Sequence, residues 1–131
     1  MGITKAEALK AVDRERGPVC EASDRIWDQP ETAFQEFHST DVLCELLEKE
    51  GFRVERNLAG IATAFSGTYG SGKPVVGILG EFDALSGLSQ ESESLEKTAL
   101  VDGAPGHGCG HNLLGTGSVA AAIAVKEYLE K

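Results

Sequence analysis

Two imidazoles and one thiol lie close together in segment 106–112, which reads GHGCGHN. One residue separates Cys109 from His111, so in an extended backbone their side chains point to the same side and can bind one cation. Gly108 and Gly110 allow backbone conformations that are closed to other residues, and they leave space for a ligand. The segment therefore predicts a metal or catalytic site in a loop that leads into a helix.

A metal site at this segment needs further ligands. A structural zinc ion typically takes four protein ligands and a catalytic zinc ion typically three. The other histidine and thiols of the chain are His38, Cys20 and Cys44. We expect His38 and Cys44 to be structural or solvated, because His38 precedes a predicted helix cap and Cys44 lies beside the apolar stripe of that helix. Each residue of segment 106–112, taken alone, could also be structural.

Two carboxylates are candidate partners for these ligands. The nearly all-apolar run 74–80 predicts a strand covered on both faces, and Glu81 and Asp83 follow at its end. In an open α/β sheet, ligands bind at such strand ends. A metal-bound histidine also commonly donates its second N–H to a carboxylate. The alternative is that Glu81 and Asp83 only face solvent or cap a turn.

Two other chemistries are open for segment 106–112. Cys109 beside His107 or His111 could act as a thiolate nucleophile, although the one-residue spacing suits shared coordination better. A glycine-rich turn before a helix could instead bind a phosphate on the helix N–H groups. Its glycine spacing is not that of a phosphate-binding fingerprint, no lysine follows, and the upstream carboxylates would repel an anion. Metal binding is the preferred interpretation.

The composition argues against several classes of partner. The chain has 131 residues and a formal net charge of −9, which disfavours nucleic acid or an anionic membrane as a partner. Its three cysteines have no framework spacing, so we expect a reducing, cytoplasmic location. The longest apolar run, 119–125, is too short to cross a bilayer, and no leader sequence is recognisable. These features indicate one domain with a core of its own.

Periodicity and turn residues predict the elements that position these groups, with helices on both sides of a sheet. Before the apolar strand we expect a helix from Thr4 towards Trp27, with a capping box to Glu7 and a division at 17–18. A loop over 27–34 with Phe34 buried should follow. We then expect a helix from a cap at Ser39 to Gly51 and a hairpin of 52–56 and 61–65. After it we expect a long loop over 85–105 and a helix capped by Asn112, with Leu114, Ser118, Ala121, Val125 and Tyr128 on one face.

Two motifs also carry a family resemblance. Segment 80–85 (GEFDAL) followed by segment 106–115 (GHGCGHNLLG) resembles the amidohydrolase branch of the two-metal aminoacylase and carboxypeptidase G metallopeptidases, of the p-aminobenzoyl-glutamate hydrolase type. Segment 26–33 and the helix that ends at Gly51 fit the opening of that family too. The resemblance therefore covers nearly the whole chain, and its two motifs occur in the expected order.

The resemblance implies roles for the candidate residues. Cys109 would be a thiolate ligand that bridges two ions, and His111 would be a second ligand with His107 close by. Asp83 matches an acidic residue at the strand end that would contact the metal ligands rather than the ions. Glu81 occupies a position where other branches carry a ligating histidine, so the resemblance assigns it no definite role.

The resemblance also implies a fold and an activity. The fold would be an α/β three-layer sandwich with a mixed sheet, like that of zinc exopeptidases, with residues 1–131 forming the N-terminal portion of the catalytic domain and its C-terminal part missing. The complete enzyme, expected to be a homodimer, would use two divalent ions, zinc or manganese, to hydrolyse N-acyl or aryl-acyl amino acids or small peptides. The chain alone is not expected to hydrolyse amides. The alternative is a non-catalytic fragment that acts as a binding or assembly partner.

Two positions depart from the family pattern. Ser86 replaces a proline that usually follows the Asp-Ala-Leu run, and Asn112 replaces the aspartate of other amidohydrolase branches. We expect both departures to be tolerated.

Overall fold

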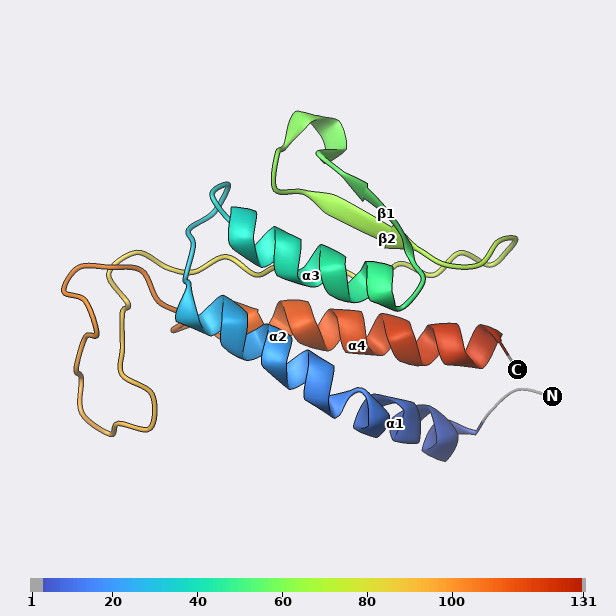
Figure 1. Ribbon diagram of the computed structural model, residues 1–131, viewed down its shortest axis with the longest axis horizontal. Helices are drawn as coiled ribbons and strands as arrows, with labels where there is room; N and C mark the ends of the chain where they lie inside the picture. Colours follow the sequence, from blue (N-terminus) through green and yellow to red (C-terminus); the bar gives the residue numbers. More distant parts are fainter. Residues whose placement is uncertain (1–3, 131) are drawn as a thin grey trace.

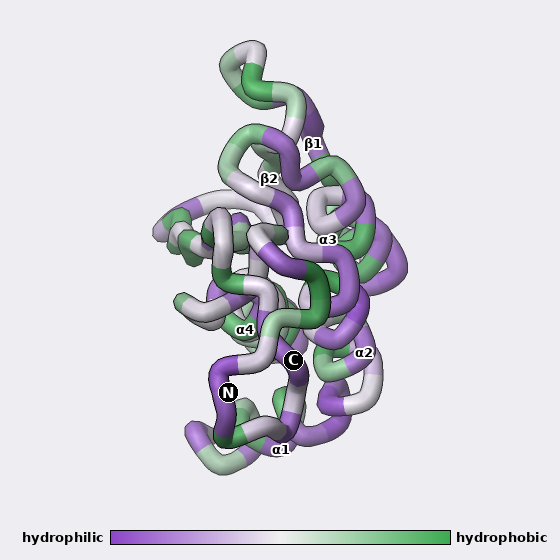
Figure 2. The backbone as a smooth tube through the Cα atoms, turned by 90° about the vertical axis from the view of Figure 1, so that its left-hand side faces the viewer, coloured by the Kyte–Doolittle hydropathy of each residue, from purple (hydrophilic) through white to green (hydrophobic). Residues whose placement is uncertain are grey.

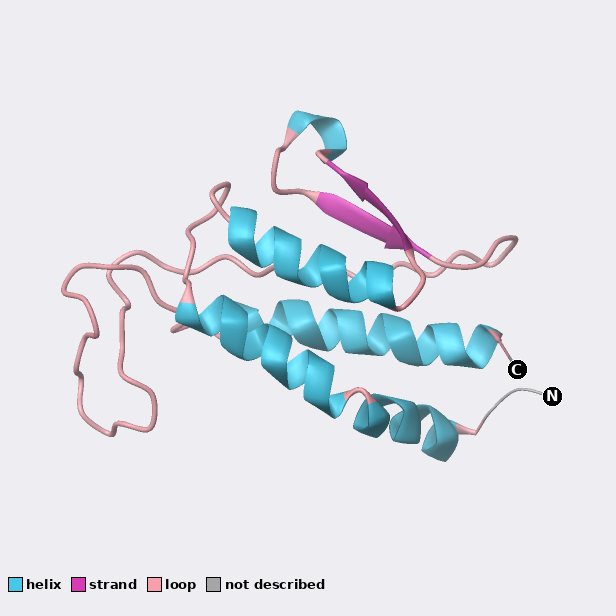
Figure 3. Ribbon diagram, in the orientation of Figure 1, coloured by secondary structure: helices cyan, strands magenta, loops and turns pink. Residues whose placement is uncertain are grey.

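Four α-helices and one short hairpin make up the part of the chain that the structure describes. The computed structural model describes residues 4–130. Helices α2, α3 and α4 lie side by side, α1 continues the line of α2, and the hairpin covers α3 (Figures 1 and 3). Within residues 4–130, no helix is long and apolar enough to span a membrane. The elements are α1 (Lys5–Arg14), α2 (Arg16–Asp28), α3 (Phe37–Lys49), β1 (Arg53–Arg56), the 3-10 turn η1 (Leu58–Gly60), β2 (Phe65–Thr68) and α4 (His111–Leu129).

The first helical stretch is divided as predicted, but the break lies at Glu15 rather than at 17–18. α1 starts with the expected capping box, in which the Glu7 N–H donates to Thr4 Oγ1 at 3.3 Å and the Thr4 N–H donates to Glu7 Oε2 at 2.7 Å. α1 ends at Arg14, and Gly17 and Pro18 lie in the first turn of α2. Proline is tolerated there because the N–H groups of a first helical turn have no partner within the helix.

The core lies between α2, α3 and α4. α3 begins at Phe37 rather than after Ser39, which is buried in its first turn. The helix ends as predicted, because Gly51 follows the C-cap with a φ of +80°. Hydrophilic and hydrophobic residues alternate along α2 and α3, as expected for helices with one buried face (Figure 2). The buried core residues are Ala22, Ile26, Val42, Leu43, Leu46, Leu47, Phe52, Val119 and Ile123.

The predicted hairpin forms with a shifted second strand. β1 pairs antiparallel with β2, in a register that places Arg53 opposite Thr68 and Arg56 opposite Phe65. The second strand therefore starts at Phe65, where the predicted one ended. The connection between the two strands contains the 3-10 turn η1. The Leu58 N–H donates to the Ala64 carbonyl at 3.2 Å, which closes this connection.

The expected buried strand at 74–80 is not formed. In the described part of the chain, this segment has no strand partner, and Val75 and Leu79 are 84% and 92% exposed. A strand needs a neighbour for its backbone N–H and C=O groups, and a central strand needs cover on both faces. The observed architecture is a mixed α/β arrangement with a two-stranded antiparallel sheet, so the three-layer sandwich is not formed by residues 4–130.

The final helix begins two residues earlier than predicted, and it buries a different face. Its N-cap is Gly110, in a left-handed conformation, and Asn112 lies buried in the first turn. Leu114, Val125 and Tyr128 on the predicted face are exposed, whereas the opposite stripe packs in the core. Because α4 is rich in small and apolar residues all round, its periodicity does not define one face. The buried residues of α4 are Asn112, Gly115, Thr116, Val119, Ala120, Ile123 and Ala124.

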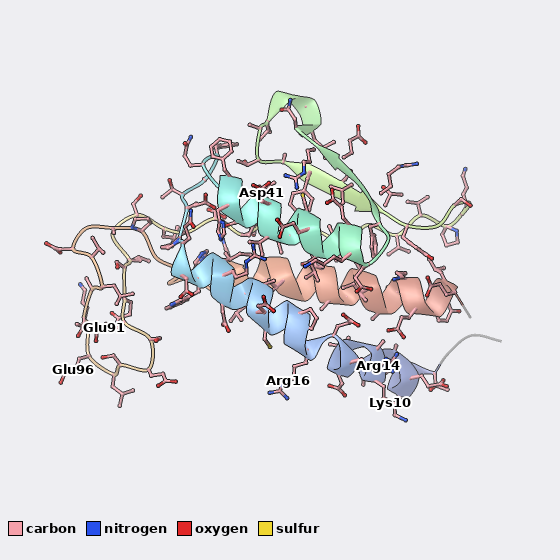
Figure 4. The ribbon with its side chains drawn as sticks, viewed as in Figure 1. Lys10, Arg14, Arg16, Asp41, Glu91 and Glu96 are labelled. Atoms are coloured by element: carbon pink, nitrogen blue, oxygen red, sulfur yellow. The ribbon has the colours of Figure 1, made fainter. Side chains whose placement is uncertain are left out.

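Two loops flank the helices. The 85–105 loop forms as predicted and extends away from the helices, with Glu91 and Glu96 on its outer part (Figure 4). Phe34 was expected to be buried but is 67% exposed. A left-handed conformation at Phe34, with φ of 66°, turns the chain between α2 and α3 and directs the ring towards the open cavity described below.

Candidate metal site

Backbone hydrogen bonds fix the segment that carries the two carboxylates. On one side, the Ala84 N–H donates to the Glu31 carbonyl at 2.7 Å, within a parallel bridge between Thr32 and Ala84. On the other side, Leu85 and Gly106 exchange two backbone hydrogen bonds, each of 3.0 Å. The segment is therefore held between the α2–α3 connection and the start of the GHGCGHN segment.

Small residues of α4 allow the same segment to cross the helix closely. A Cβ added at Gly115 would lie 3.0 Å from Phe82 Cβ and 3.3 Å from the Glu81 carbonyl oxygen. A Cβ added at Gly80 would lie 3.0 Å from the side chain of Ser118, whose hydroxyl donates to the Leu79 carbonyl at 2.9 Å. This crossing places the carboxylates next to the first turn of α4.

Three of the candidate residues meet at this crossing. Glu81, Asp83 and His111 each offer a ligand atom, and these atoms lie within 4.8 Å of one another. The His111 Nδ1–H donates to Asp83 Oδ1 at 2.8 Å. Both side chains are only about one-fifth exposed, at 18% and 22%. A neutral imidazole that donates from Nδ1 keeps the lone pair of Nε2 for a cation.

This donor set fits a divalent transition-metal ion. One imidazole nitrogen and two carboxylates are ligand types that zinc and manganese accept. The two negative charges also favour a cation over an anion at this position. The three residues, Glu81, Asp83 and His111, therefore form a candidate metal site.

A cavity of about 610 Å³ adjoins the site. The hairpin side contributes apolar residues such as Phe65, and segment 76–83 forms the other side. Glu81 and Asp83 are the charged residues of that second side. An apolar cavity of this size with a few polar groups on one side is typical of a small-molecule site.

Comparison with known proteins shows that the chain is similar to parts of known hydrolases. The chain is 50% identical over 121 residues to a subunit of the p-aminobenzoyl-glutamate hydrolase of Escherichia coli K12, an alignment that covers 92% of the chain and 25% of that protein. It is 28% identical to human Xaa-Arg dipeptidase and 27% identical to the mouse protein, over 98% of the chain and 28% of each relative. Over most of its own length, the chain is therefore similar to one part of an amide hydrolase and, more distantly, to one part of two dipeptidases.

The similarity covers only part of each relative. No family model matches the chain. The chain spans about a quarter of the length of the hydrolases that it matches. The resemblance seen in segments 80–85 and 106–115 is nevertheless confirmed, because the match with the bacterial hydrolase covers most of the chain.

Cys109 lies apart from the group of Glu81, Asp83 and His111. Its side chain is exposed, in a turn that the Gly110 N–H closes by donating to the His107 carbonyl at 3.0 Å. Among residues 4–130, it makes no hydrogen bond to either neighbouring imidazole, because His107 has no partner at its ring nitrogens and His111 Nδ1 bonds to Asp83. This geometry does not favour a Cys-His nucleophile. The role of Cys109 as a metal ligand stays a prediction.

His107 is buried rather than placed among the ligands. The residue is 5% exposed, and its ring stacks on Trp27 with 6.4 Å between the ring centroids and 30° between the planes. Burial lowers the pKa of the His107 imidazole, and the nearby backbone of Ile26 opposes this effect without reversing it. His107 is therefore neutral at pH 7 and packs as an aromatic ring.

The glycines of the segment have distinct structural roles. Gly110 has the predicted left-handed backbone, with φ of 75°. A Cβ added at Gly108 would lie 2.7 Å from Leu88 Cδ1, and one added at Gly106 would lie 2.0 Å from the Leu88 carbonyl oxygen. Gly106 is thus the position that tolerates a side chain least, because the obstacle there is backbone. The sequence did not indicate that glycine is required at position 106.

Glu31 is a supporting residue that the sequence did not indicate. Its carboxylate accepts hydrogen bonds from the N–H groups of His38 and Ser39 and from the Ser39 hydroxyl, all of 2.8 Å. It therefore caps α3 from the preceding loop, while its carbonyl holds Ala84. Capping motifs are recognised by short fixed spacings, and this contact has none.

Proposed function

We propose that the complete protein is a metal-dependent amide hydrolase. Its substrates would be N-acyl or aryl-acyl amino acids, such as p-aminobenzoyl-glutamate, or small peptides. The observation that carries this proposal is the convergence of His111 with Asp83 and Glu81 beside an open apolar cavity. The relatives, a component of a p-aminobenzoyl-glutamate hydrolase and two dipeptidases, support the same reaction class.

The proposed roles follow from the donor types. His111 and the Cys109 thiolate would hold divalent ions, zinc or manganese, and Glu81 is close enough to supply an oxygen ligand. Asp83 accepts the hydrogen bond from His111 Nδ1 and so fixes the orientation and tautomer of the ligating ring. The ions, when bound, polarise the scissile carbonyl and lower the pKa of a bound water molecule. His107 would support the segment from the core side.

We further propose that this chain alone binds metal without hydrolysing amides. Two ions need more ligands than the three converging groups and Cys109 provide, and a general base is needed to move the proton of the attacking water. These groups would come from outside the described residues. Residues 1–131 would then be the N-terminal portion of a catalytic domain, with segment 74–80 as a strand of a three-layer α/β sandwich. The complete enzyme would work as a homodimer or with a further, different subunit.

Metal analysis of the purified chain tests the proposed site. We expect the chain to retain zinc or manganese after dialysis, and His111→Ala or Asp83→Asn to lose it. His38→Ala is the matched control, because this imidazole lies outside the group of Glu81, Asp83 and His111. A chain that retains no divalent ion, or a His38→Ala variant that loses metal equally, would contradict the metal site.

An activity comparison tests the proposed reaction. We expect no turnover of N-acyl amino acids or p-aminobenzoyl-glutamate by the 131-residue chain, and metal-dependent turnover by a longer chain that continues its reading frame. Metal-dependent hydrolysis by the 131-residue chain would refute its predicted inactivity. A longer chain that binds metal but hydrolyses none of these amides would favour the binding or assembly role instead.

A further inference from the structure

One face of α2 contacts both the first turn of α4 and the turn that precedes it. Ser23 and Trp27 lie one helical turn apart on α2, so their side chains point to the same side. Ser23 accepts a hydrogen bond of 3.0 Å from Asn112 Nδ2, and Trp27 stacks on His107. The two contacts hold the two ends of a single segment, 107–112.

Both contacts involve side chains that are buried from solvent. Ser23, His107 and Asn112 are each 5–6% exposed. A hydrogen bond between buried polar groups is costly to lose, because the partner left behind stays without water or protein contact. Among the described residues, Asn112 Oδ1 has no hydrogen-bond partner, so the bond from Nδ2 to Ser23 is the contact that fixes the orientation of this amide.

The opposite side of the segment is closed by the long loop. Leu88 packs against Gly106 and Gly108 so closely that neither has room for a Cβ. The turn between His107 and Gly110 is thus confined between α2 and Leu88. A segment held at both ends and on both sides has little freedom to move His111 relative to the carboxylates.

We propose that Ser23 and Trp27 are positioning residues of the metal site. By holding Asn112 and His107, they place His111 beside Asp83 and Glu81 before any ion binds. This inference rests on the proposed metal site, and it assigns to α2 a role that the ligand residues alone do not reveal. A preorganised site binds a cation more tightly because less conformational freedom is lost on binding.

Hydrogen exchange of the metal-free chain tests whether Ser23 and Trp27 hold segment 107–112 in place. The reporter is the Gly110 N–H, which donates to the His107 carbonyl. We expect Ser23→Ala and Trp27→Leu to speed its exchange by about tenfold or more. Trp27→Phe keeps a ring on His107 and should restore most of the protection.

A core variant separates positioning from general destabilisation. Phe52 belongs to the core and packs its ring against Tyr69 rather than against Trp27 or His107, so Phe52→Leu should lower overall stability and leave the contacts of Ser23 and Trp27 in place. We expect it to speed the exchange of the Gly110 and Ile123 N–H groups equally, whereas Ser23→Ala and Trp27→Leu should affect Gly110 selectively. Equal acceleration at both reporters in the α2 variants would overturn the inference.

Cobalt titration distinguishes this inference from the proposed function. We expect Ser23→Ala and Trp27→Leu to weaken cobalt(II) binding by about tenfold, with Trp27→Phe and Phe52→Leu within about threefold of the unmodified chain. Equal affinities in all variants would overturn the positioning role. If the unmodified chain bound no cobalt, the proposed metal site would fail, and the exchange data would still decide whether α2 holds the segment.

Discussion

Replacement of Gly106 by alanine should disrupt the junction between the two halves of the candidate site. The added Cβ would lie 2.0 Å from the Leu88 carbonyl oxygen, 2.5 Å from its carbonyl carbon and 2.9 Å from the Ser89 nitrogen. All three obstacles are backbone atoms, so no side-chain rotation relieves the clash. Gly106 also shares its two hydrogen bonds with Leu85, which a shift of the backbone would break.

The size of the effect follows from these contacts. Insertion of a methyl group into a space without room costs about 1–3 kcal/mol. Each lost backbone hydrogen bond costs about 0.5–1.5 kcal/mol. We therefore expect Gly106→Ala to lower the free energy of unfolding by about 2–6 kcal/mol, a large part of the roughly 5–15 kcal/mol that stabilises a typical domain.

Urea unfolding followed by circular dichroism measures this change, and Gly117→Ala is a matched control. Gly117 lies inside α4 with nothing within 4 Å of an added Cβ. Alanine should stabilise a helix interior by about 0.5–1 kcal/mol relative to glycine, so the two variants should change stability in opposite directions. A Gly106→Ala chain within about 0.5 kcal/mol of the unmodified chain would refute the reasoning.

Three further predictions concern other parts of the chain. Glu31→Gln should lower the free energy of unfolding by about 1–2 kcal/mol in urea, because an amide accepts less strongly from the start of α3, and the exposed Glu48→Gln should have no effect. Thr4→Ala should lower it by about 1 kcal/mol by removing the capping box, and unchanged helicity and stability would contradict this. Burial raises the pKa of the Cys44 thiol from 9.0 to about 11. The folded state therefore keeps this thiol neutral, and stability should fall as the pH rises from 9 to 11, where the unfolded chain releases the proton first. Urea unfolding at pH 8 and pH 10 should detect this loss, and Cys44→Ala should show less of it.

Helix ends were predictable where the signal lies in neighbouring residues. The Thr4 capping box and the end of α3 at Gly51 depend on contacts within one turn, and both are confirmed. The start of α3 was predicted wrongly, because its cap is the Glu31 side chain, from outside the helix. Local patterns therefore predict local contacts and miss those that come from further along the chain.

The strand and the face of α4 were not predictable for a different reason. Composition indicates that segment 74–80 prefers extended structure, but pairing depends on a neighbouring strand that residues 4–130 do not supply. α4 carries apolar residues on several faces, so only its actual neighbours determine which stripe is buried.

The candidate site was predictable in its residue types and only partly in its arrangement. The types and order of Asp83 and His111 indicated that both belong near one site, and the structure places them in hydrogen-bond contact. Their meeting depends on Gly115, where the absence of a side chain lets the carboxylate segment cross α4. The exposed position of Cys109 follows from a turn whose direction no spacing rule gives.

The exposed segment 74–80 has a practical consequence for work with this chain. It is a largely β-branched and aliphatic run without charge, bounded by Lys73 and Glu81. Apart from the Leu79 carbonyl, which accepts from Ser118, its backbone has no hydrogen-bond partner among residues 4–130 and can pair with another copy of itself. Such runs drive self-association into ordered deposits when chains are concentrated. A lysine in place of Val75, which is 84% exposed, should keep the chain in solution at higher concentration and should leave the packing of the helices intact.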